Sequence, residues 1–337
     1  MKRSPISRTE QPSILVHVTG DRIGDALIKW PAIVALKNAL PDYRLVWLAG
    51  LRKSVFSDAL ASLAEGVIDE VRDMAGIGVS WRELMRPPPP GKFDIVVATE
   101  AKIRNAVLLK RIAHEVFISP ALNFRLSDRK PAPDRPYPDA VFEQMRCLAT
   151  LAAGRELDVD PRIEVGTENE HLAAELLPAG ERYVGLAVGA AGKVKRWPLA
   201  RYIELAKRLR EKGRTPVFFL GPEEVSLYGE IRDAQPAALF PEQDPRARGR
   251  TGPLLTIALA QRIALGVAND AGGGHLLAAG GQRLITLFGR TNVDKFKPPY
   301  GSRIVITASE YGGTDVALIP VERVSEAIDA VFQVDAR

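Results

Sequence analysis

One stretch near the carboxyl end decides how we expect the chain to fold. It reads Gly266-Val-Ala-Asn-Asp-Ala-Gly-Gly-Gly-His-Leu-Leu-Ala-Ala-Gly-Gly-Gln-Arg-Leu-Ile-Thr-Leu-Phe-Gly289. An apolar strand end and a polar elbow precede three glycines, and small residues then predict a helix that opens at His275. Glycines leave room for a ligand beside the main chain, and the free N–H groups at a helix start favour an anion. The stretch therefore predicts a site for a phosphate-bearing ligand.

Composition limits the broad class of the protein. The chain has 337 residues, of which 46% are hydrophobic, enough for two ordinary domains. Its formal charge of +5 suits nucleotides, phosphorylated glycans or an anionic membrane surface, but an ordinary solvated basic surface fits equally well. Cys147, the one cysteine, lies in a helical apolar pattern and is expected to be a core residue in a reducing compartment.

The ends and the apolar runs predict where the protein works. Residues 1–12 are polar and read as a disordered leader without a signal peptide. No apolar run reaches the length of a membrane span. We therefore expect a cytoplasmic protein, at most peripheral at the inner face of the cytoplasmic membrane, with no nucleic-acid partner.

The first half alternates apolar strands with helices, and a glycine turn follows the first strand. Such strand, turn, helix, strand units build parallel sheets. The expected strands are 13–18, 44–49, 67–71, 93–98 and 115–119. The expected helices are 26–40, 55–64, 81–85, 106–113 and 139–153.

The second half repeats the pattern after a polar boundary at 154–169, which contains a short candidate strand at 162–165. Its expected strands are 183–188, 216–220, 265–267, 284–288 and 303–307. Its expected helices are 170–177, 198–211 with Pro198 as first residue, 254–262 and 321–332. We predict two doubly wound α/β domains, 13–165 and 170–337, with ligands in the cleft between them. The last helix is free to pack back on the first domain.

The loop after the first strand does not match a dinucleotide fingerprint. Gly20-Asp-Arg-Ile-Gly-Asp25 differs from G-x-G-x-x-G, and Gly50 stands where an acidic residue would bind ribose. A dehydrogenase is therefore disfavoured. Asp25 precedes a helix, so it is either an N-cap or a carboxylate open to the cleft that acts as a general base. Position alone favours the cap.

Loops of the second half offer phosphate and ribose contacts. Lys193, Lys195 and Arg196 are either solvated surface cations or partners of a phosphate. Glu223 and Glu224 can accept hydrogen bonds from ribose hydroxyls, or they are ordinary helix-start glutamates. Asp270 and His275 are either ligand contacts or caps satisfied by the backbone.

Three ordered motifs resemble the heptosyltransferase family of inverting glycosyltransferases, glycosyltransferase family 9, over nearly the whole chain after residue 12. They are Ile23-Gly-Asp-Ala-Leu-Ile-Lys-Trp-Pro31, Lys195-Arg-Trp-Pro198, and Asp270-Ala-Gly-Gly-Gly-His-Leu-Leu-Ala-Ala279 followed by Gly289-Arg-Thr291. The resemblance implies a GT-B architecture, two Rossmann-like domains that face a central cleft. It also implies that Asp25 is the catalytic aspartate.

Three positions depart from the family pattern. Ala271 stands where relatives carry a hydroxyl residue, and Arg290 replaces a proline. The first-domain strand end, Ala98-Thr-Glu-Ala101, differs from the family's D-x-Q-G. The donor chemistry is thus expected to be retained, whereas the acceptor stays undetermined.

The resemblance implies transfer of a heptose from ADP-heptose to an acidic or lipid-linked glycan of the lipopolysaccharide-core type. Asp25 would be the base and Lys195 would meet the charge of the leaving diphosphate, together with N–H groups near Gly274 and His275, without metal or cofactor. The expected donor contacts are Gly192, Lys193, Arg196, Glu223, Asp270, Gly272, Gly273, Gly274 and His275, and the expected acceptor contacts are Arg52, Lys53, Lys102 and Arg104. Two alternatives stay open: a non-catalytic nucleotide-sugar-binding module, and a nucleotide-sugar epimerase or hydrolase.

Overall fold

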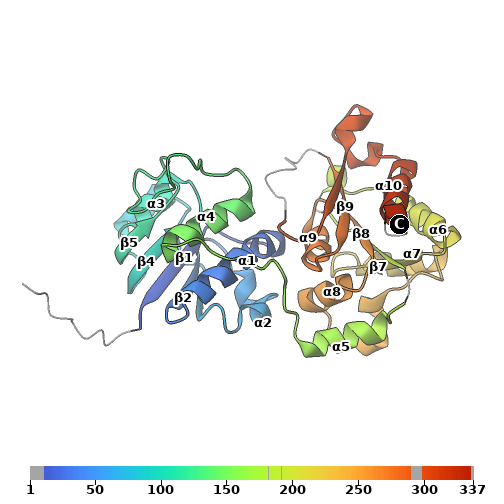
Figure 1. Cartoon of the computed structure of the whole chain (residues 1–337), viewed down its shortest axis with the longest axis horizontal. Helices are drawn as coiled ribbons and strands as arrows, with labels where there is room; N and C mark the ends of the chain where they lie inside the picture. Colours follow the sequence, from blue (N-terminus) through green and yellow to red (C-terminus); the bar gives the residue numbers. More distant parts are fainter. Residues whose placement is uncertain (1–10, 181, 191, 290–297, 335–337) are drawn as a thin grey trace, which may run out of the picture. The chain divides into compact units, whose positions relative to one another are not determined.

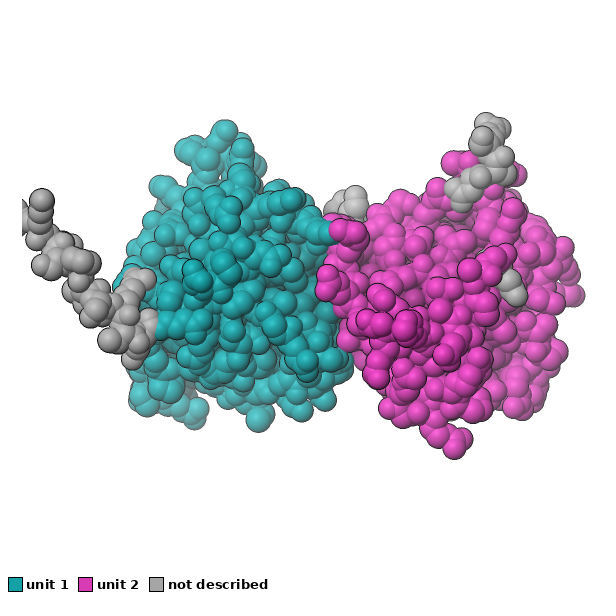
Figure 2. All heavy atoms as spheres, turned by 60° about the horizontal axis from the view of Figure 1, so that its bottom comes forward, with its two compact units in different colours: residues 1–160 teal, residues 161–337 magenta. Residues whose placement is uncertain are grey.

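The chain forms two compact units, residues 1–160 and 161–337 (Figure 2). The computed structural model describes residues 11–334, except for 181, 191 and 290–297. The division between the units falls inside the polar stretch 154–169, where the sequence changes from a helix to extended chain.

The first unit is a five-stranded parallel sheet with helices around it (Figure 1). Its strand order is β3 (Glu70–Arg72), β2 (Arg44–Ala49), β1 (Ser13–Val18), β4 (Lys92–Ala98) and β5 (Ala113–Ile118). Val16 at the centre pairs with Trp47 on one side and Val97 on the other. Its helices are α1 (Ile23–Ala39), α2 (Ala61–Ala64), α3 (Ile103–Leu109) and α4 (Val141–Ala153), with 3-10 turns η1 (Val55–Ser57) and η2 (Trp81–Met85). The strands β1, β2 and β4 are buried on both faces over most of their length, which explains why they read as continuous apolar runs.

The second unit holds another five-stranded parallel sheet. Its order is β10 (Arg303–Thr307), β9 (Arg283–Phe288), β8 (Leu265–Asn269), β6 (Tyr183–Ala187) and β7 (Thr215–Phe219). Helices α5 (Thr167–Leu176) and α9 (Gly272–Ala279) pack on α8 (Pro253–Ala260), and α6 (Leu199–Glu211) packs on α10 (Val321–Val334). The remaining short elements are α7 (Tyr228–Ala234) and the 3-10 turns η3 (Lys193–Lys195), η4 (Val225–Leu227), η5 (Pro241–Gln243), η6 (Pro245–Ala247), η7 (Ala308–Tyr311) and η8 (Val316–Leu318).

Several expectations about these elements are wrong. Residues 162–165 form no strand: Ile163 and Val165 are buried, but no neighbouring strand offers their backbone a ladder partner. Pro198 is the N-cap of α6 rather than its first residue, with an extended ψ of 135°. The last helix, α10, packs on α6, and its residues Val324, Ile328 and Val331 belong to the core of the second unit.

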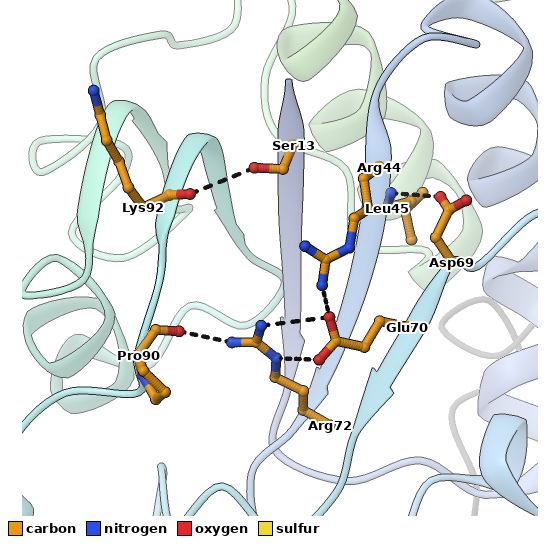
Figure 3. A network of polar contacts seen from close by, with 8 residues as sticks. All are labelled: Ser13, Arg44, Leu45, Asp69, Glu70, Arg72, Pro90 and Lys92. Atoms are coloured by element: carbon orange, nitrogen blue, oxygen red, sulfur yellow. Dashed lines mark hydrogen bonds and ion pairs between the residues drawn. The ribbon is translucent and has the colours of Figure 1, made fainter. Parts of the chain in front are cut away.

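Polar contacts tie together the amino ends of the strands in the first unit (Figure 3). Glu70 accepts hydrogen bonds from Arg44 and, at 2.7 Å, from Arg72. The Oδ2 atom of Asp69 accepts from the backbone N–H of Leu45 at 2.7 Å. These strand starts are thus fixed by side chains.

No helix in the described part of the chain combines the length and the apolar character needed to cross a bilayer.

Candidate active site

Most of the predicted site residues gather where the strand order of each sheet reverses. That point lies between β1 and β4 in the first unit and between β6 and β8 in the second. In open parallel sheets, loops at the carboxyl ends of the strands diverge there and leave space for a ligand. Asp25 and Lys102 follow β1 and β4, and Lys195 and Asp270 follow β6 and β8.

Asp25 occupies the first turn of α1, and it is not the N-cap. The cap position belongs to Arg22, whose side chain makes no cap hydrogen bond. The reason is that the helix starts earlier than expected, at Ile23, so Asp25 is the third helical residue. Its carboxylate is half-buried and forms no hydrogen bond or ion pair with a described residue. No described group therefore competes with a ligand for this carboxylate.

A polar cluster lies beside this loop at the end of β4. Glu100 accepts hydrogen bonds from the hydroxyl of Thr19, from its backbone N–H at 3.3 Å, and from Asn105 at 3.1 Å. The ammonium of Lys102 lies 3.0 Å from the same carboxylate. Burial raises the pKa of Glu100, but the bonds from Thr19 and Lys102 outweigh it and hold the pKa below its usual value. Glu100 therefore stays ionised at neutral pH and fixes the loop that leads to Asp25.

His17 lies on β1 next to this cluster and is fully buried. Burial lowers the pKa of its ring to about 4, although the nearby Glu100 carboxylate opposes the shift. The imidazole is therefore neutral at physiological pH and adds no positive charge to the site.

The four cations predicted to bind the acceptor differ in their contacts. Lys102 pairs with Glu100, and Lys53 lies 3.8 Å from Asp58 in a solvent-exposed pair. Arg104 donates a hydrogen bond to the carbonyl of Gly78. The exposed Arg52 lies over the loop after β1, since a Cβ atom added at Gly20 would be 3.9 Å from its side chain.

In the second unit, Lys195 and Asp270 face each other across the point where the strand order reverses. Their charged atoms are 3.8 Å apart, and Lys195 is 40% exposed against 10% for Asp270. Lys195 ends η3, the short turn that begins at Lys193; the side chain of Lys193 lies outside the described part. Arg196 donates to the carbonyl of Ala190 at 2.9 Å, which folds the loop that contains Gly192 back on itself.

Asn269 holds this loop in place, and the sequence prediction missed its role. Its side-chain amide is fully buried at the end of β8. It donates to the carbonyls of Val188 at 3.0 Å and Gly189 at 3.2 Å, and accepts from the N–H of Trp197 at 3.0 Å. A polar residue that ends an apolar strand beside a glycine run was the available signal.

Two glutamates follow β7, and they differ in position. Glu223 is exposed and makes no hydrogen bond or ion pair with a described residue. The carboxylate of Glu224 lies against Gly189 and Gly221, where an added Cβ would come within 2.5 and 3.2 Å of it. Burial and the neighbouring Glu223 raise the pKa of Glu224. Of the two glutamates, Glu224 is thus the carboxylate that faces the loop after β6.

Helix α9 begins at Gly272, three residues before the predicted start at His275. Glycine is compatible with helical dihedral angles, and the three glycines form the first turn themselves. Their N–H groups donate to no described backbone or side-chain acceptor, as is usual for the start of a helix. Gly274 has to be glycine, because a Cβ there would lie 2.6 Å from the carbonyl oxygen of Asn269. Ala271, the N-cap, contributes no side-chain bond.

A hollow opens at this helix start. Asp270, Ala271, Gly274 and His275 line one part of it. The rest is formed by Asn269, Leu284, Thr286, Pro298 and Arg303. The predicted residues Arg290 and Thr291 fall outside the described part. Within the described ranges, no group of three or more His, Cys, Asp or Glu side chains is placed to hold a metal ion.

Comparisons with known proteins identify the family of the chain. The model of glycosyltransferase family 9 (heptosyltransferase) matches residues 82–316. Lipopolysaccharide heptosyltransferase 2 of Escherichia coli K12 is 32% identical over 148 residues, which are 41% of this chain and 40% of that protein. The match thus spans less than half of the length of this curated relative.

Two solved structures share the fold over almost their full length. The family 9 glycosyltransferase of Veillonella parvula has a TM-score of 0.68 at 19% identity and covers 95% of this chain and 97% of its own. The ADP-heptose lipopolysaccharide heptosyltransferase II of E. coli has a TM-score of 0.63 at 20% identity, covering 96% and 100%. The two parallel-sheet units are therefore those of the expected GT-B fold, and the chain belongs to glycosyltransferase family 9, the heptosyltransferase family.

Proposed function

We propose that the protein transfers a heptose from ADP-heptose to a glycan acceptor of the lipopolysaccharide-core type, with inversion at the anomeric carbon and without a metal ion. Family membership and the relatives' names support the sugar, the nucleotide and the acceptor class. The observation that carries the chemistry is Asp25, a carboxylate in the first turn of α1 that no described side chain or backbone group engages.

In this mechanism Asp25 takes the proton of an acceptor hydroxyl. The hydroxyl oxygen forms a bond to the anomeric carbon from the face opposite the diphosphate. The bond between that carbon and the phosphate oxygen breaks, and its electron pair leaves with ADP. A positioned general base contributes on the order of 10²–10⁴ in rate.

The second unit is proposed to bind the donor. The ammonium of Lys195 and the N–H groups of Gly272, Gly273 and Gly274 would meet the charge that develops on the diphosphate. Asp270 lies 3.8 Å from Lys195, so the ammonium is on the side of the helix start. The carboxylates of Glu223 and Glu224, which follow β7, are candidates for the ribose hydroxyls.

The test is transfer by Asp25→Asn with ADP-heptose and a deacylated lipopolysaccharide core. We expect normal folding and ADP binding, and a loss of at least about 10² in turnover. Asp42→Asn, which removes an exposed carboxylate elsewhere in the first unit, is the matched control and should keep full activity. Near-normal turnover of Asp25→Asn would refute the assignment.

The same assay separates the alternatives. A wild-type protein that binds ADP-heptose but neither transfers nor hydrolyses it would be a binding module. Release of free heptose without an acceptor would indicate a hydrolase.

A further inference from the structure

The segment 73–91, which joins β3 to β4 in the first unit, presents large apolar side chains to solvent. Met85 is 81% exposed, Met74 70%, Val79 61% and Trp81 52%. Leu84 is also exposed. Large exposed apolar side chains that gather in one segment are a feature of interaction surfaces.

A buried glutamate fixes the backbone of this segment. Glu83, which is itself buried, accepts hydrogen bonds from the N–H groups of Gly78, Val79 and Ser80 at 2.9, 2.8 and 2.6 Å. Ser80 caps η2 in return, so the pair forms a capping box. The turn is therefore ordered, and its outward apolar side chains are not the result of a loose loop.

Contacts from the neighbouring elements complete the support. The guanidinium of Arg111 donates to the carbonyls of Glu83 at 3.2 Å and Arg86 at 2.7 Å. Arg72 donates to the carbonyl of Pro90 at 2.7 Å, at the end of the proline run (Figure 3). Side chains from β3 and from the residues before β5 thus also hold the backbone of the segment in place.

Charges are sorted between the two sides of the segment. Its two acidic residues face inward: Glu83 is buried, and Asp73 accepts from the N–H of Ser54 at 2.7 Å and the hydroxyl of Ser57 at 2.6 Å. Arg82 and Arg86 are exposed and form no ion pair with a described residue. The outward side is therefore apolar and cationic, which complements an anionic lipid surface. Trp81 suits the headgroup region, because indole has an apolar body and a polar N–H.

The inner side of the segment touches the loop that leads to Asp25. A Cβ at Gly78 would lie 3.2 Å from the methyl carbon of Thr19, and the Gly78 carbonyl accepts from Arg104. If this segment contacts a bilayer, the loop that leads to Asp25 therefore lies close to the lipid headgroups.

We propose that segment 73–91 docks the protein on an anionic bilayer, with Trp81, Leu84 and Met85 entering the headgroup region and Arg82 and Arg86 contacting acidic lipids. The docking deepens the proposed function, because a lipid-linked acceptor has to be reached at the membrane. Its biological purpose rests on that function, but lipid binding itself requires neither donor nor acceptor.

The experiment is sedimentation of the full chain with vesicles of phosphatidylcholine that contain about a third phosphatidylglycerol. We expect binding to these vesicles, less binding to pure phosphatidylcholine, and weaker binding as salt shortens the Debye length. Trp81→Ser with Met85→Ser should lower the vesicle partition coefficient at least about tenfold, and Arg82→Glu with Arg86→Glu should abolish the preference for the anionic lipid. Val334→Ser and Arg248→Glu, exposed residues of the second unit, are the matched controls and should bind like the wild type.

Three results would overturn the proposal: no vesicle binding by the wild type, unchanged binding by both double variants, or a dimer in light scattering that Trp81→Ser with Met85→Ser converts to a monomer. The last would mean that a second copy of the chain covers this surface. Transfer to a deacylated acceptor separates the two proposals. It should survive Trp81→Ser with Met85→Ser, while Asp25→Asn should lose transfer and still bind vesicles.

Discussion

Lys195 is the residue whose contacts most depend on a ligand. It holds only one described charge partner, Asp270, at 3.8 Å, and remains 40% exposed. Such a half-exposed pair is weak, so a diphosphate can take over the ammonium. We expect Lys195→Gln to lower kcat by about 10²–10³, as for loss of other electrostatic stabilisers.

The measurement is steady-state transfer with ADP-heptose, and Lys207→Gln, an exposed lysine of α6, is the control. An unchanged kcat with a raised KM would mean that Lys195 binds donor and transition state equally.

A second single residue, Asn269, is expected to affect stability. Its hydrogen bonds to Val188 and Trp197 are buried, and the one to Gly189 is part-buried. Asn269→Ala removes the partner of these backbone groups, at a cost of about 1–3 kcal/mol in the free energy of unfolding. It should also weaken ADP binding, because the loop with Lys195 loses its support.

Urea unfolding and calorimetric titration with ADP test both effects. Asn169→Ala, which removes a part-buried bond to the Val165 carbonyl, is the control and should cost less. Equal losses in the two variants would show that the loop does not depend on Asn269.

At the scale of elements, two glycines in the first turn of α9 look alike in the sequence but differ in their surroundings. A Cβ at Gly274 would come within 2.6 Å of the Asn269 carbonyl, whereas a Cβ at Gly272 meets nothing within 4 Å. Gly274→Ala has to displace the helix start and should destabilise the protein by about 1–3 kcal/mol. Gly272→Ala should be neutral or stabilise by a few tenths to about 1 kcal/mol, because alanine loses less conformational entropy in a helix.

Thermal unfolding of the two variants measures the difference. A similar loss in both would mean that the close approach at Gly274 relaxes without cost.

The sequence predicted the elements better than their contacts. Strands 13–18, 44–49 and 303–307 have the predicted bounds, because buried runs of apolar residues end sharply at polar or glycine residues. Helix starts were predicted less well: α1 begins at Ile23 and α9 at Gly272, since neither Arg22 nor Ala271 is a typical cap.

The same holds for the candidate site: its residues were predicted better than their contacts. The motifs were sufficient to find Asp25, Lys195 and Asp270 as candidates. The bonds of Glu100 to Thr19 and of Asn269 to Trp197 span 81 and 72 residues, and no local pattern encodes such pairs. The capping box of Ser80 and Glu83 could have been read from its spacing.

At the scale of the molecule, His17 makes stability depend on pH. The pKa of its ring is about 4 in the fold against 6.5 in an exposed histidine, so the folded protein binds fewer protons than the unfolded chain between these values. The free energy of unfolding therefore keeps its full value above pH 6.5 and decreases as the pH falls towards 4. For the shift in the pKa of His17, the free energy of unfolding should be about 2–3 kcal/mol lower at pH 4.5 than at pH 7.

Urea unfolding at pH 7 and pH 4.5 tests this, with His17→Leu as the variant that cannot titrate. The variant should lose less stability between the two pH values than the wild type. Parallel losses would assign the acid sensitivity to other groups.

Nucleotide binding should stabilise the two units unequally. The proposed donor contacts, Lys195, Asp270 and the glycines of α9, all belong to residues 161–337 (Figure 2). A ligand that binds only the folded state stabilises it by RT ln(1 + [L]/Kd), about 2.7 kcal/mol at a hundredfold excess over Kd. With ADP, hydrogen exchange should therefore slow in 192–197 and 269–279, and remain unchanged in 19–25. UDP and GDP at the same concentration should protect these segments less, because the proposed donor is an adenine nucleotide. Protection by UDP or GDP in place of ADP would reject ADP-heptose as donor but leave the fold and the site in unit 2 intact, and protection confined to 19–25 would reject the second unit as the donor site.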